Sequence, residues 1–159
     1  MSEPAGEGGG RLLTFEVGGA VFALPIAAVA EVAEVGRIAA VPTLPAAVGG
    51  VTNLHGDALP VVARAALLPL GDAPLGPPRH LLVLAKSPDD ASRYGLPVDG
   101  IRGLVDGEGG TALGDDAIVE RRPIEGRVVC VLDPKRLLAR AMQVIERSVH
   151  GTDAGGGEA

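Results

Sequence analysis

The sequence is poor in aromatic residues and has a single cysteine. Among its 159 residues there is no tryptophan, and the aromatic side chains are Phe15, Phe22 and Tyr94. A buried core must therefore be filled mainly by Val, Leu, Ile and Ala, of which Val and Ile favour strands. Cys130 alone excludes an intrachain disulfide and is expected to be a packed, unreactive thiol. A chain without disulfides fits the cytoplasm.

Positive charge and long apolar runs are also scarce. The net charge is -6 and no segment carries a basic stripe, whereas a nucleic-acid binder needs Lys and Arg against phosphates and aromatic side chains for stacking. Every apolar run is interrupted by Pro, Gly or charge before the roughly 20 residues that a membrane span requires. The start of the chain is acidic where a secretory signal would be basic. We therefore expect a cytoplasmic protein that binds no nucleic acid and does not insert into a membrane.

Both ends of the chain are rich in glycine and polar residues. Residues 1–10 and 151–159 contain too little apolar side chain to offset the entropy of ordering them, so each is expected to be a disordered tail. The folded body then comprises residues 11–150. That length suits one compact unit or two small sub-barrels that share a core.

Short strands dominate the pattern of the body. Two runs of strand-forming residues flank Gly18 and Gly19, which predicts a tight hairpin. Residues 27–35 carry valines three apart, which predicts a short helix or a helical turn, and a longer helix is expected to begin with Asp133 as N-cap and Pro134 at its first position. Further strands are expected within residues 48–62, around a central turn, and at residues 80–85, 94–98 and 127–132. The sequence thus predicts a mostly β fold with a short early helix and a C-terminal helix.

The sequence shows no group of residues whose types and spacing indicate catalysis or metal binding. Four aspartates lie in polar, turn-like stretches, where turn chemistry explains them better than acid–base catalysis: Asp99, Asp106, Asp115 and Asp116. The histidines are scattered and give no metal-ligand spacing: His55, His80 and His150. No Gly-rich loop ends in the Gly-Lys-Ser/Thr of a phosphate-binding loop. We therefore predict no catalytic residue, cofactor or metal site, and binding through apolar grooves and edges is the default function.

One stretch resembles the signature of CheW-like domains, in which proline and a spacer precede G-V-x-N-L-R-G and then P-V. The matching residues here are Gly50-Val51-Thr52-Asn53-Leu54-His55-Gly56, followed by Pro60-Val61. Other features of that family occur in the expected order from about Leu12 to Leu138. The resemblance implies two interleaved, small five-stranded β-barrels packed around a shared hydrophobic core.

The resemblance also implies a function and a set of contact residues. Free-standing members of this family are non-catalytic adaptors, which couple the cytoplasmic tip of methyl-accepting chemoreceptors to a CheA-type histidine kinase in bacterial chemosensory arrays. Carried over by position, the receptor-binding residues are Val29, Gly50, Asn53 and His55, and the kinase-binding residue is Glu31. A purely structural role is the alternative for Gly50, which permits unusual strand geometry, and for Asn53, which can serve its own turn.

The chain departs from the family pattern at His55, where arginine is usual. Arginine is always charged and binds carboxylates with two parallel hydrogen bonds, whereas histidine is mostly neutral near pH 7. Our hypothesis is that the receptor contact of this protein is weaker or suited to a divergent receptor. The alternative is that His55 merely occupies the top of a turn.

Two other functions stay open on the sequence alone. One is a CheW-like scaffold that binds a single partner, for example to localise an array. The other is a small β-barrel hydrolase, which would require acidic side chains that meet in a cleft.

Overall fold

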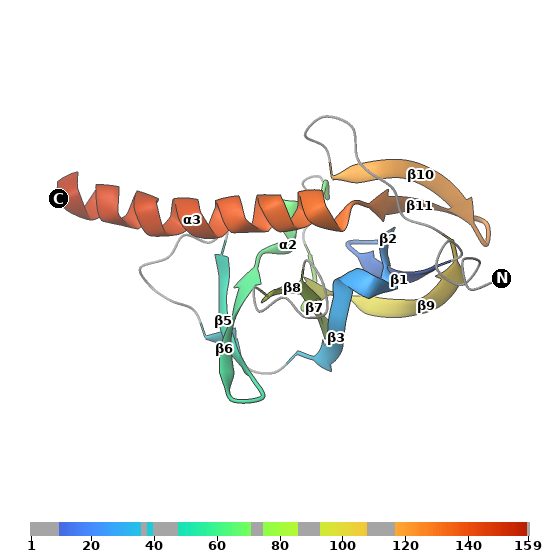
Figure 1. Cartoon of the computed structure of the whole chain (residues 1–159), viewed down its shortest axis with the longest axis horizontal. Helices are drawn as coiled ribbons and strands as arrows, with labels where there is room; N and C mark the ends of the chain where they lie inside the picture. The colour runs from blue at the N-terminus through green and yellow to red at the C-terminus, as the bar shows by residue number, and fades with distance from the viewer. Residues whose placement is uncertain are drawn as a thin grey trace.

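The computed structural model describes residues 10–35, 38–39, 48–70, 75–85, 93–107 and 117–158. The strands form two sheets that lie side by side along one long helix (Figure 1). The first sheet has the order β10-β11-β2-β1-β9, with β1 Arg11–Val17, β2 Ala20–Pro25, β9 Gly100–Asp106, β10 Ile118–Ile124 and β11 Arg127–Leu132. The second has the order β3-β7-β8-β6-β5-β4, with β3 Val29–Glu34, β4 Ile38–Ala39, β5 Val48–Leu54, β6 Asp57–Val62, β7 His80–Ala85 and β8 Arg93–Val98.

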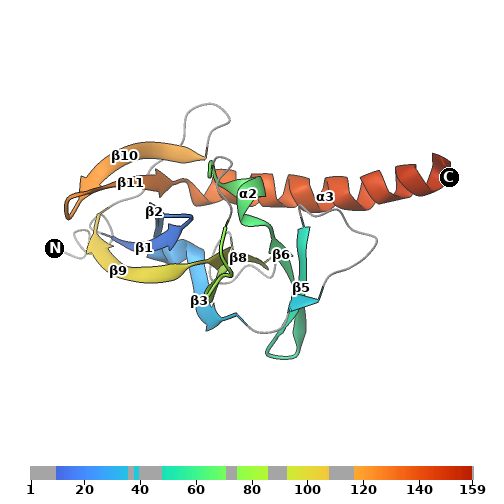
Figure 2. The same cartoon turned by 180° about the vertical axis from the view of Figure 1, so that it is seen from behind.

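The predicted mostly β fold with two subdomains is confirmed. The first sheet has five strands as expected, and the second has six because the two-residue strand β4 pairs with β5. The helical elements are the 3-10 turn η1 Ile26–Ala28, the short helix α2 Arg64–Leu67 and the long helix α3 Pro134–Glu158. Figure 2 shows from behind that α2 lies against α3, where Arg140 donates a hydrogen bond of 3.4 Å to the carbonyl of Leu67.

Several strands bury side chains on both faces, which produces three hydrophobic clusters. The central cluster receives side chains from both sheets, α2 and α3, and its largest members are Tyr94, Phe15, Phe22, Leu24, Leu67, Leu82, Leu96, Leu132 and Leu137. The first inner cluster lies on the other face of the first sheet and contains Leu12, Val21, Ala23, Val129 and Val131. The second inner cluster lies on the other face of the second sheet and contains Leu59, Val61, Leu81 and Val83. Alternate residues of β2 and β7 therefore serve different clusters, which explains their nearly continuous apolar sequences.

The β1–β2 hairpin has the predicted glycine turn. Gly18 and Gly19 have φ values of 60° and 84°, a region that glycine adopts without steric cost. A Cβ added at Gly18 would lie 2.8 Å from a terminal methyl group of Leu75, so that side chain would have to shift. Conformation and packing therefore both favour glycine at position 18.

The predicted helix at residues 27–35 is wrong apart from its first turn. Only the segment up to Ala28 is helical, and the rest forms strand β3, which pairs antiparallel with β7. A strand has a period of two, so Val29 is half-buried whereas Val32 is exposed, and the spacing of three does not mark one face. The register of β3 shifts between Val29 and Glu31, which is the mark of a β-bulge.

Helix α3 begins as predicted. Asp133 is buried, its carboxylate accepts a hydrogen bond of 3.0 Å from the backbone N–H of Lys135, and its carbonyl accepts one from Leu137. Leu137 and Ala141 are fully buried in the central cluster. The helix continues to Glu158, beyond residue 150, where the folded body was expected to end. No helix in the described parts of the chain is long and apolar enough to span a membrane.

A partly buried polar contact connects the two sheets. Asp99, between β8 and β9, accepts hydrogen bonds from the backbone N–H of Gly18 at 2.7 Å and from Nη1 of Arg64 at 2.6 Å. Arg64 is nearly buried and also donates to the carbonyl of Gly76 at 2.8 Å. Asp99 thus binds the β1–β2 turn of the first sheet to the segment that follows β6 of the second, which is a structural role.

Candidate functional site

The β5–β6 hairpin carries the stretch that resembles the family signature. Its two-residue turn is His55-Gly56, between the paired residues Leu54 and Asp57. His55 and Gly56 have φ values of 53° and 90°, as a type I′ turn requires. The Asn53 carboxamide oxygen accepts a hydrogen bond of 3.0 Å from the backbone N–H of Gly56. Asn53 therefore serves its own turn, and its contact with a receptor stays a prediction.

The side chain of His55 extends from this turn to the edge strand β3. Nε2 of His55 lies 2.8 Å from one oxygen of the Glu31 carboxylate and 3.0 Å from the other. The two side chains are 70% and 32% exposed, respectively, so solvent and partners have access to both. The structure thus brings together the position predicted to bind receptor and the position predicted to bind kinase.

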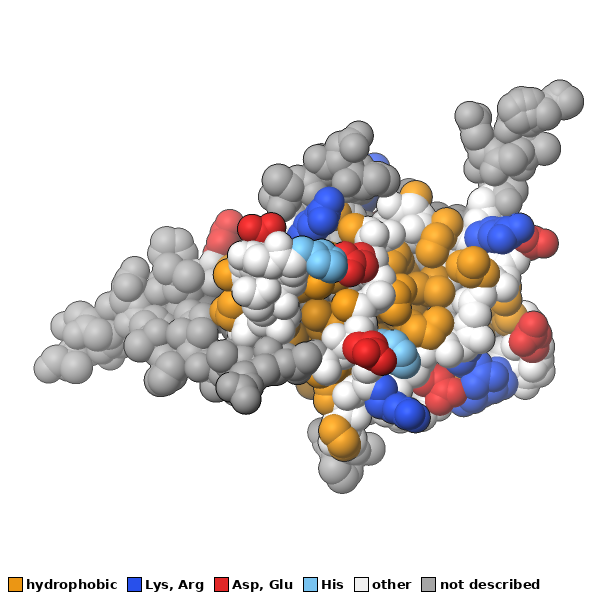
Figure 3. Space-filling model, turned by 90° about the horizontal axis from the view of Figure 1, so that it is seen from below, with side chains coloured by type: hydrophobic (Ala, Val, Ile, Leu, Met, Phe, Trp, Pro, Cys, Tyr) orange, Lys and Arg blue, Asp and Glu red, His pale blue; other side chains and the backbone are white. Residues whose placement is uncertain are grey.

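Hydrophobic side chains lie near the two segments that make this contact. Val35, directly after β3, and Leu54, the last residue of β5, both pack on the second inner cluster. Figure 3 views this face of the molecule and shows hydrophobic side chains between the hairpin and β3, and a second group beyond β3 toward the first sheet. The candidate site therefore combines the accessible polar side chains of His55 and Glu31 with neighbouring apolar side chains.

The other two predicted receptor residues are less accessible. Gly50 is buried on β5 with a φ of 131°, next to a register shift between Val48 and Gly50. Such a bulge with positive φ requires glycine on structural grounds. Val29 begins β3, is half-buried and packs against the central cluster. For both residues, contact with a receptor stays a prediction.

The resemblance suggested apolar residues at a sheet edge as contacts for the kinase, but sequence reasoning did not identify which residues these are. Val32 is 43% exposed one residue after Glu31, and Ile26 in η1 is 40% exposed. On β9 of the first sheet, Leu104 is 50% exposed. The incorrect helical prediction hid Val32, because it placed this valine on a buried stripe. Exposed apolar residues beside charged ones are typical of binding surfaces.

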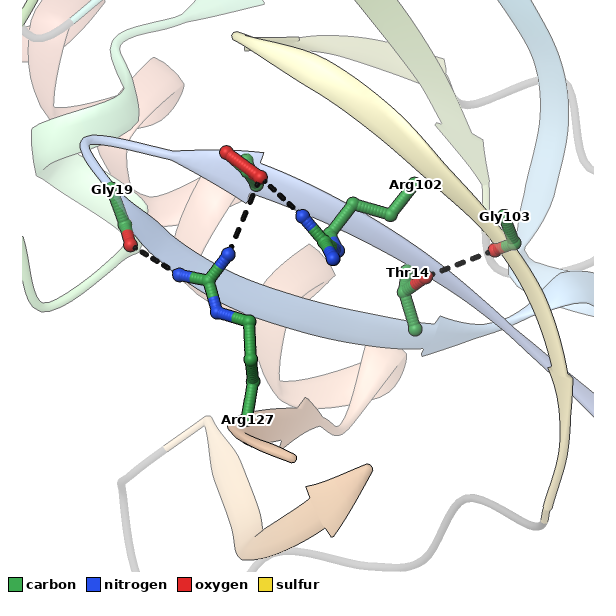
Figure 4. A network of polar contacts seen from close by, with 6 residues as sticks. Thr14, Gly19, Arg102, Gly103 and Arg127 are labelled. Atoms are coloured by element: carbon green, nitrogen blue, oxygen red, sulfur yellow. Dashed lines mark hydrogen bonds and ion pairs between the residues drawn. The ribbon is translucent and has the colours of Figure 1, made fainter. Parts of the chain in front are cut away.

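The first sheet has its own long-range polar network, drawn in Figure 4. Glu16 on β1 accepts a hydrogen bond of 2.6 Å from Arg102 of β9 and lies 3.6 Å from Arg127 of β11. Arg127 also donates to the carbonyl of Gly19 at 3.0 Å, and Thr14 donates to the carbonyl of Gly103 at 3.1 Å. A cavity of about 90 Å³ lies beside this network between β9 and the β10–β11 hairpin.

The pKa values of Glu120 and Tyr94 are shifted by their surroundings in the fold. The hydrogen bond from Arg122 lowers the pKa of the Glu120 carboxyl, and burial raises the pKa of Tyr94 far above its ordinary value. Asp106 lies 3.8 Å from Arg11 at the surface. Among the residues that the structure describes, no group of three or more His, Cys, Asp or Glu side chains is placed to bind a metal ion. Asp115 and Asp116 lie outside those residues.

Cys130 and His80 are part of the packing. Cys130 on β11 is half-buried and lies against the central cluster, as expected for a structural thiol. His80 begins β7 opposite Glu34 of β3, with Nδ1 buried. His150 lies in α3.

Comparisons with known proteins agree with this architecture. The family model of the CheW-like domain matches residues 11–142. The crystal structure of scaffolding protein TtCheW from Thermoanaerobacter tengcongensis superposes with a TM-score of 0.63 at 16% sequence identity, covering 79% of this chain and 84% of that chain. No curated protein sequence matches the chain significantly. The family match spans most of the chain, and the likeness in structure shows the same fold; the chain belongs to the CheW-like domain family.

Proposed function

We propose that this protein is a non-catalytic adaptor that couples methyl-accepting chemoreceptors to a CheA-type histidine kinase. The family match over residues 11–142 supports the proposal, and so does the fold shared with a protein named as a scaffold. The observation that carries it is the contact between His55 and Glu31. The residues proposed to meet the two partners lie 2.8 Å apart and are both accessible, which supports a shared docking region.

The receptor contact is proposed at the β5–β6 hairpin and the start of β3. His55 offers a ring N–H donor at the tip, and the apolar residues Val35 and Leu54 lie behind it. Gly50 is buried and has no side chain that could obstruct the approach of a receptor helix. Val29 begins β3, two residues before Glu31, and Asn53 lies on β5, two residues before His55. A helical hairpin tip with acidic and apolar side chains suits this combination.

The kinase contact is proposed along β3. This strand lies at one end of the second sheet, so a partner strand or loop can approach its outer edge. Glu31 supplies charge there, and exposed Val32 supplies apolar area. Together they give the polar rim and apolar centre of a protein–protein contact.

The test is a reconstitution with both partners. The purified chain is mixed with a CheA-type kinase and with a receptor fragment that contains the cytoplasmic tip, separately and together, and binding is measured by calorimetry. We expect both partners to bind. His55→Ala should weaken receptor binding by about three- to ten-fold, as expected for the loss of one polar contact, and Glu31→Ala should weaken kinase binding similarly.

Glu125 provides a matched control. It has a φ of 50° in the β10–β11 turn, the same backbone conformation as His55, but lies on the first sheet. Glu125→Ala should leave both affinities unchanged. Binding of one partner only would reduce the protein to a single-partner scaffold, and failure to bind either would contradict the proposal. Turnover of a substrate by the purified chain would contradict its non-catalytic part.

A further inference from the structure

A polar groove lies where the start of β9 meets the residue that precedes β7. Its volume is about 430 Å³, and its lining consists of Glu16, Arg79, Asp99, Gly100, Ile101 and Arg102. None of these lining residues belongs to β3 or to the β5–β6 hairpin, so the groove is separate from the contact between His55 and Glu31. A Cβ added at Gly100 would meet no atom within 4 Å, so the lining faces open space at that residue.

Both carboxylates of the groove are already bound by arginines. Asp99 accepts a hydrogen bond of 2.6 Å from Nη1 of Arg64, and Glu16 accepts one of 2.6 Å from Nη1 of Arg102. Figure 4 shows that a second guanidinium group, that of Arg127, approaches Glu16 from β11, at 3.6 Å. With Arg79, four arginines thus accompany two carboxylates, which leaves two positive charges in excess in a chain whose net charge is -6.

Arg79 contributes a charge that is not neutralised within the described part of the chain. Its side chain is exposed and makes no hydrogen bond or ion pair with any residue that the structure describes. Its main chain is held on both sides, because its N–H donates to the carbonyl of Val98 at 2.9 Å and its carbonyl accepts from Val35 at 3.4 Å. The groove therefore has one guanidinium group with all its donors available, on a fixed backbone.

Arg102 can bind a second anion without leaving Glu16 uncompensated. A guanidinium group has five N–H donors, and the contact with Glu16 uses Nη1. Arg127 stays beside Glu16, because it also donates a hydrogen bond of 3.0 Å to the carbonyl of Gly19. The remaining donors of Arg102 and those of Arg79 can therefore bind further carboxylates, which guanidinium groups contact through two parallel hydrogen bonds.

We propose that this groove, here called the arginine groove, binds an acidic peptide segment of a partner protein. Two available guanidinium groups suit a segment with at least two Asp or Glu side chains close together, and clusters of arginines are a recurring means of recognising acidic motifs. The Arg102 side chain is 40% exposed and Arg79 is exposed, so an extended segment can reach both. Because the contacts join opposite charges near solvent, salt should weaken them.

The test titrates the full chain into a fluorescein-labelled peptide with the sequence Ser-Glu-Glu-Ser-Glu-Glu-Ser and records fluorescence anisotropy at low and at high salt. We expect binding at low salt that weakens at high salt, and no binding of the same peptide with Gln in place of Glu. Arg79→Gln and Arg102→Gln should each weaken binding by about three- to ten-fold, as expected for the loss of charge-assisted hydrogen bonds. Arg121→Gln removes an exposed charge on β10, outside the groove, and should leave the affinity unchanged.

Arg79→Gln is the decisive variant, because its side chain makes no contact in the described fold whose loss could unfold the chain. As a second measurement, adding the peptide should shift the NMR signals of the Gly100, Ile101 and Arg102 amides. Four outcomes would overturn the proposal: no binding at low salt, equal affinity for the Glu and Gln peptides, equal losses in Arg79→Gln and Arg121→Gln, or NMR shifts confined to residues outside the groove. Neither kinase nor receptor is present, so the result is independent of the proposed function.

Discussion

The two sheets make their long-range polar contacts with different chemistry. In the first sheet, Glu16 lies between Arg102 and Arg127, whose guanidinium groups stay charged at every physiological pH. In the second sheet, Glu31 faces the single imidazole ring of His55. Both networks connect strands distant in sequence and both are partly exposed. The carboxylate of Glu16 therefore joins three strands of the first sheet, whereas the contact in the second sheet joins the β5–β6 turn to β3 through one pair of side chains, on the face proposed to bind partners.

The largest effect is expected when the connection shared by both sheets is broken. Asp99→Ala removes the acceptor for Gly18 and for the nearly buried Arg64 and should lower the free energy of unfolding by about 2–3 kcal/mol. Urea denaturation gives the change. The control is Asp106→Ala, whose partner Arg11 is 3.8 Å away and whose side chain is 93% exposed; its effect should stay within about 0.5 kcal/mol. Equal losses in the two variants would show that the Asp99 contact does not stabilise the arrangement of the sheets.

An intermediate effect on stability is expected when the carboxylate of each network is replaced. Glu16→Gln should destabilise the protein by about 0.5–1 kcal/mol, because its carboxylate faces two guanidinium groups. Glu31→Gln should destabilise the protein less, because its contact is with the single, 70% exposed side chain of His55. Urea denaturation of both variants tests the contrast. An equal loss in the two variants would remove the distinction between the sheets.

The smallest effect is expected for the contact between Arg122 and Glu120, which both lie on β10 of the first sheet. Arg122 donates to both oxygens of Glu120, at 2.7 and 3.2 Å, and lowers the pKa of that carboxyl. The stabilisation is therefore present above the pKa of the unfolded chain and is lost as the pH falls through the lower folded value. Arg122→Ala should return the pKa of Glu120 toward its ordinary value, as seen by NMR titration of the side-chain carboxyl. Arg121→Ala, at the neighbouring exposed position, should leave it unmoved.

Much of the fold could be predicted because its signals are local. Gly18 and Gly19 predicted the first hairpin, and Asp133 predicted the start of α3, since turns and caps depend on a few adjacent residues. The alternation of the strands and the family resemblance gave the mostly β class. Residues 27–35 were predicted incorrectly because their valine spacing suits a helix, while pairing with β7 decided the outcome.

The candidate site was harder to predict because it depends on tertiary structure. The resemblance selected His55 and Glu31 separately, for different partners, and no spacing in the sequence indicated that they touch. Their contact results from the curvature of the second sheet, which brings the β5–β6 turn beside β3. The same reasoning explains why Val32 was missed, since its exposure follows from the position of β3 at the end of that sheet.

The three two-residue turns have a consequence for how this surface can vary. Each ends in glycine, and the first positions are Gly18, His55 and Glu125, all with positive φ. Such a backbone disfavours β-branched side chains, because their Cβ substituents collide with the main chain. Valine, isoleucine and threonine are thereby disfavoured at position 55. A substitution that changes the charge at position 55 is then compatible with the turn, and the backbone conformation of the hairpin tip stays the same.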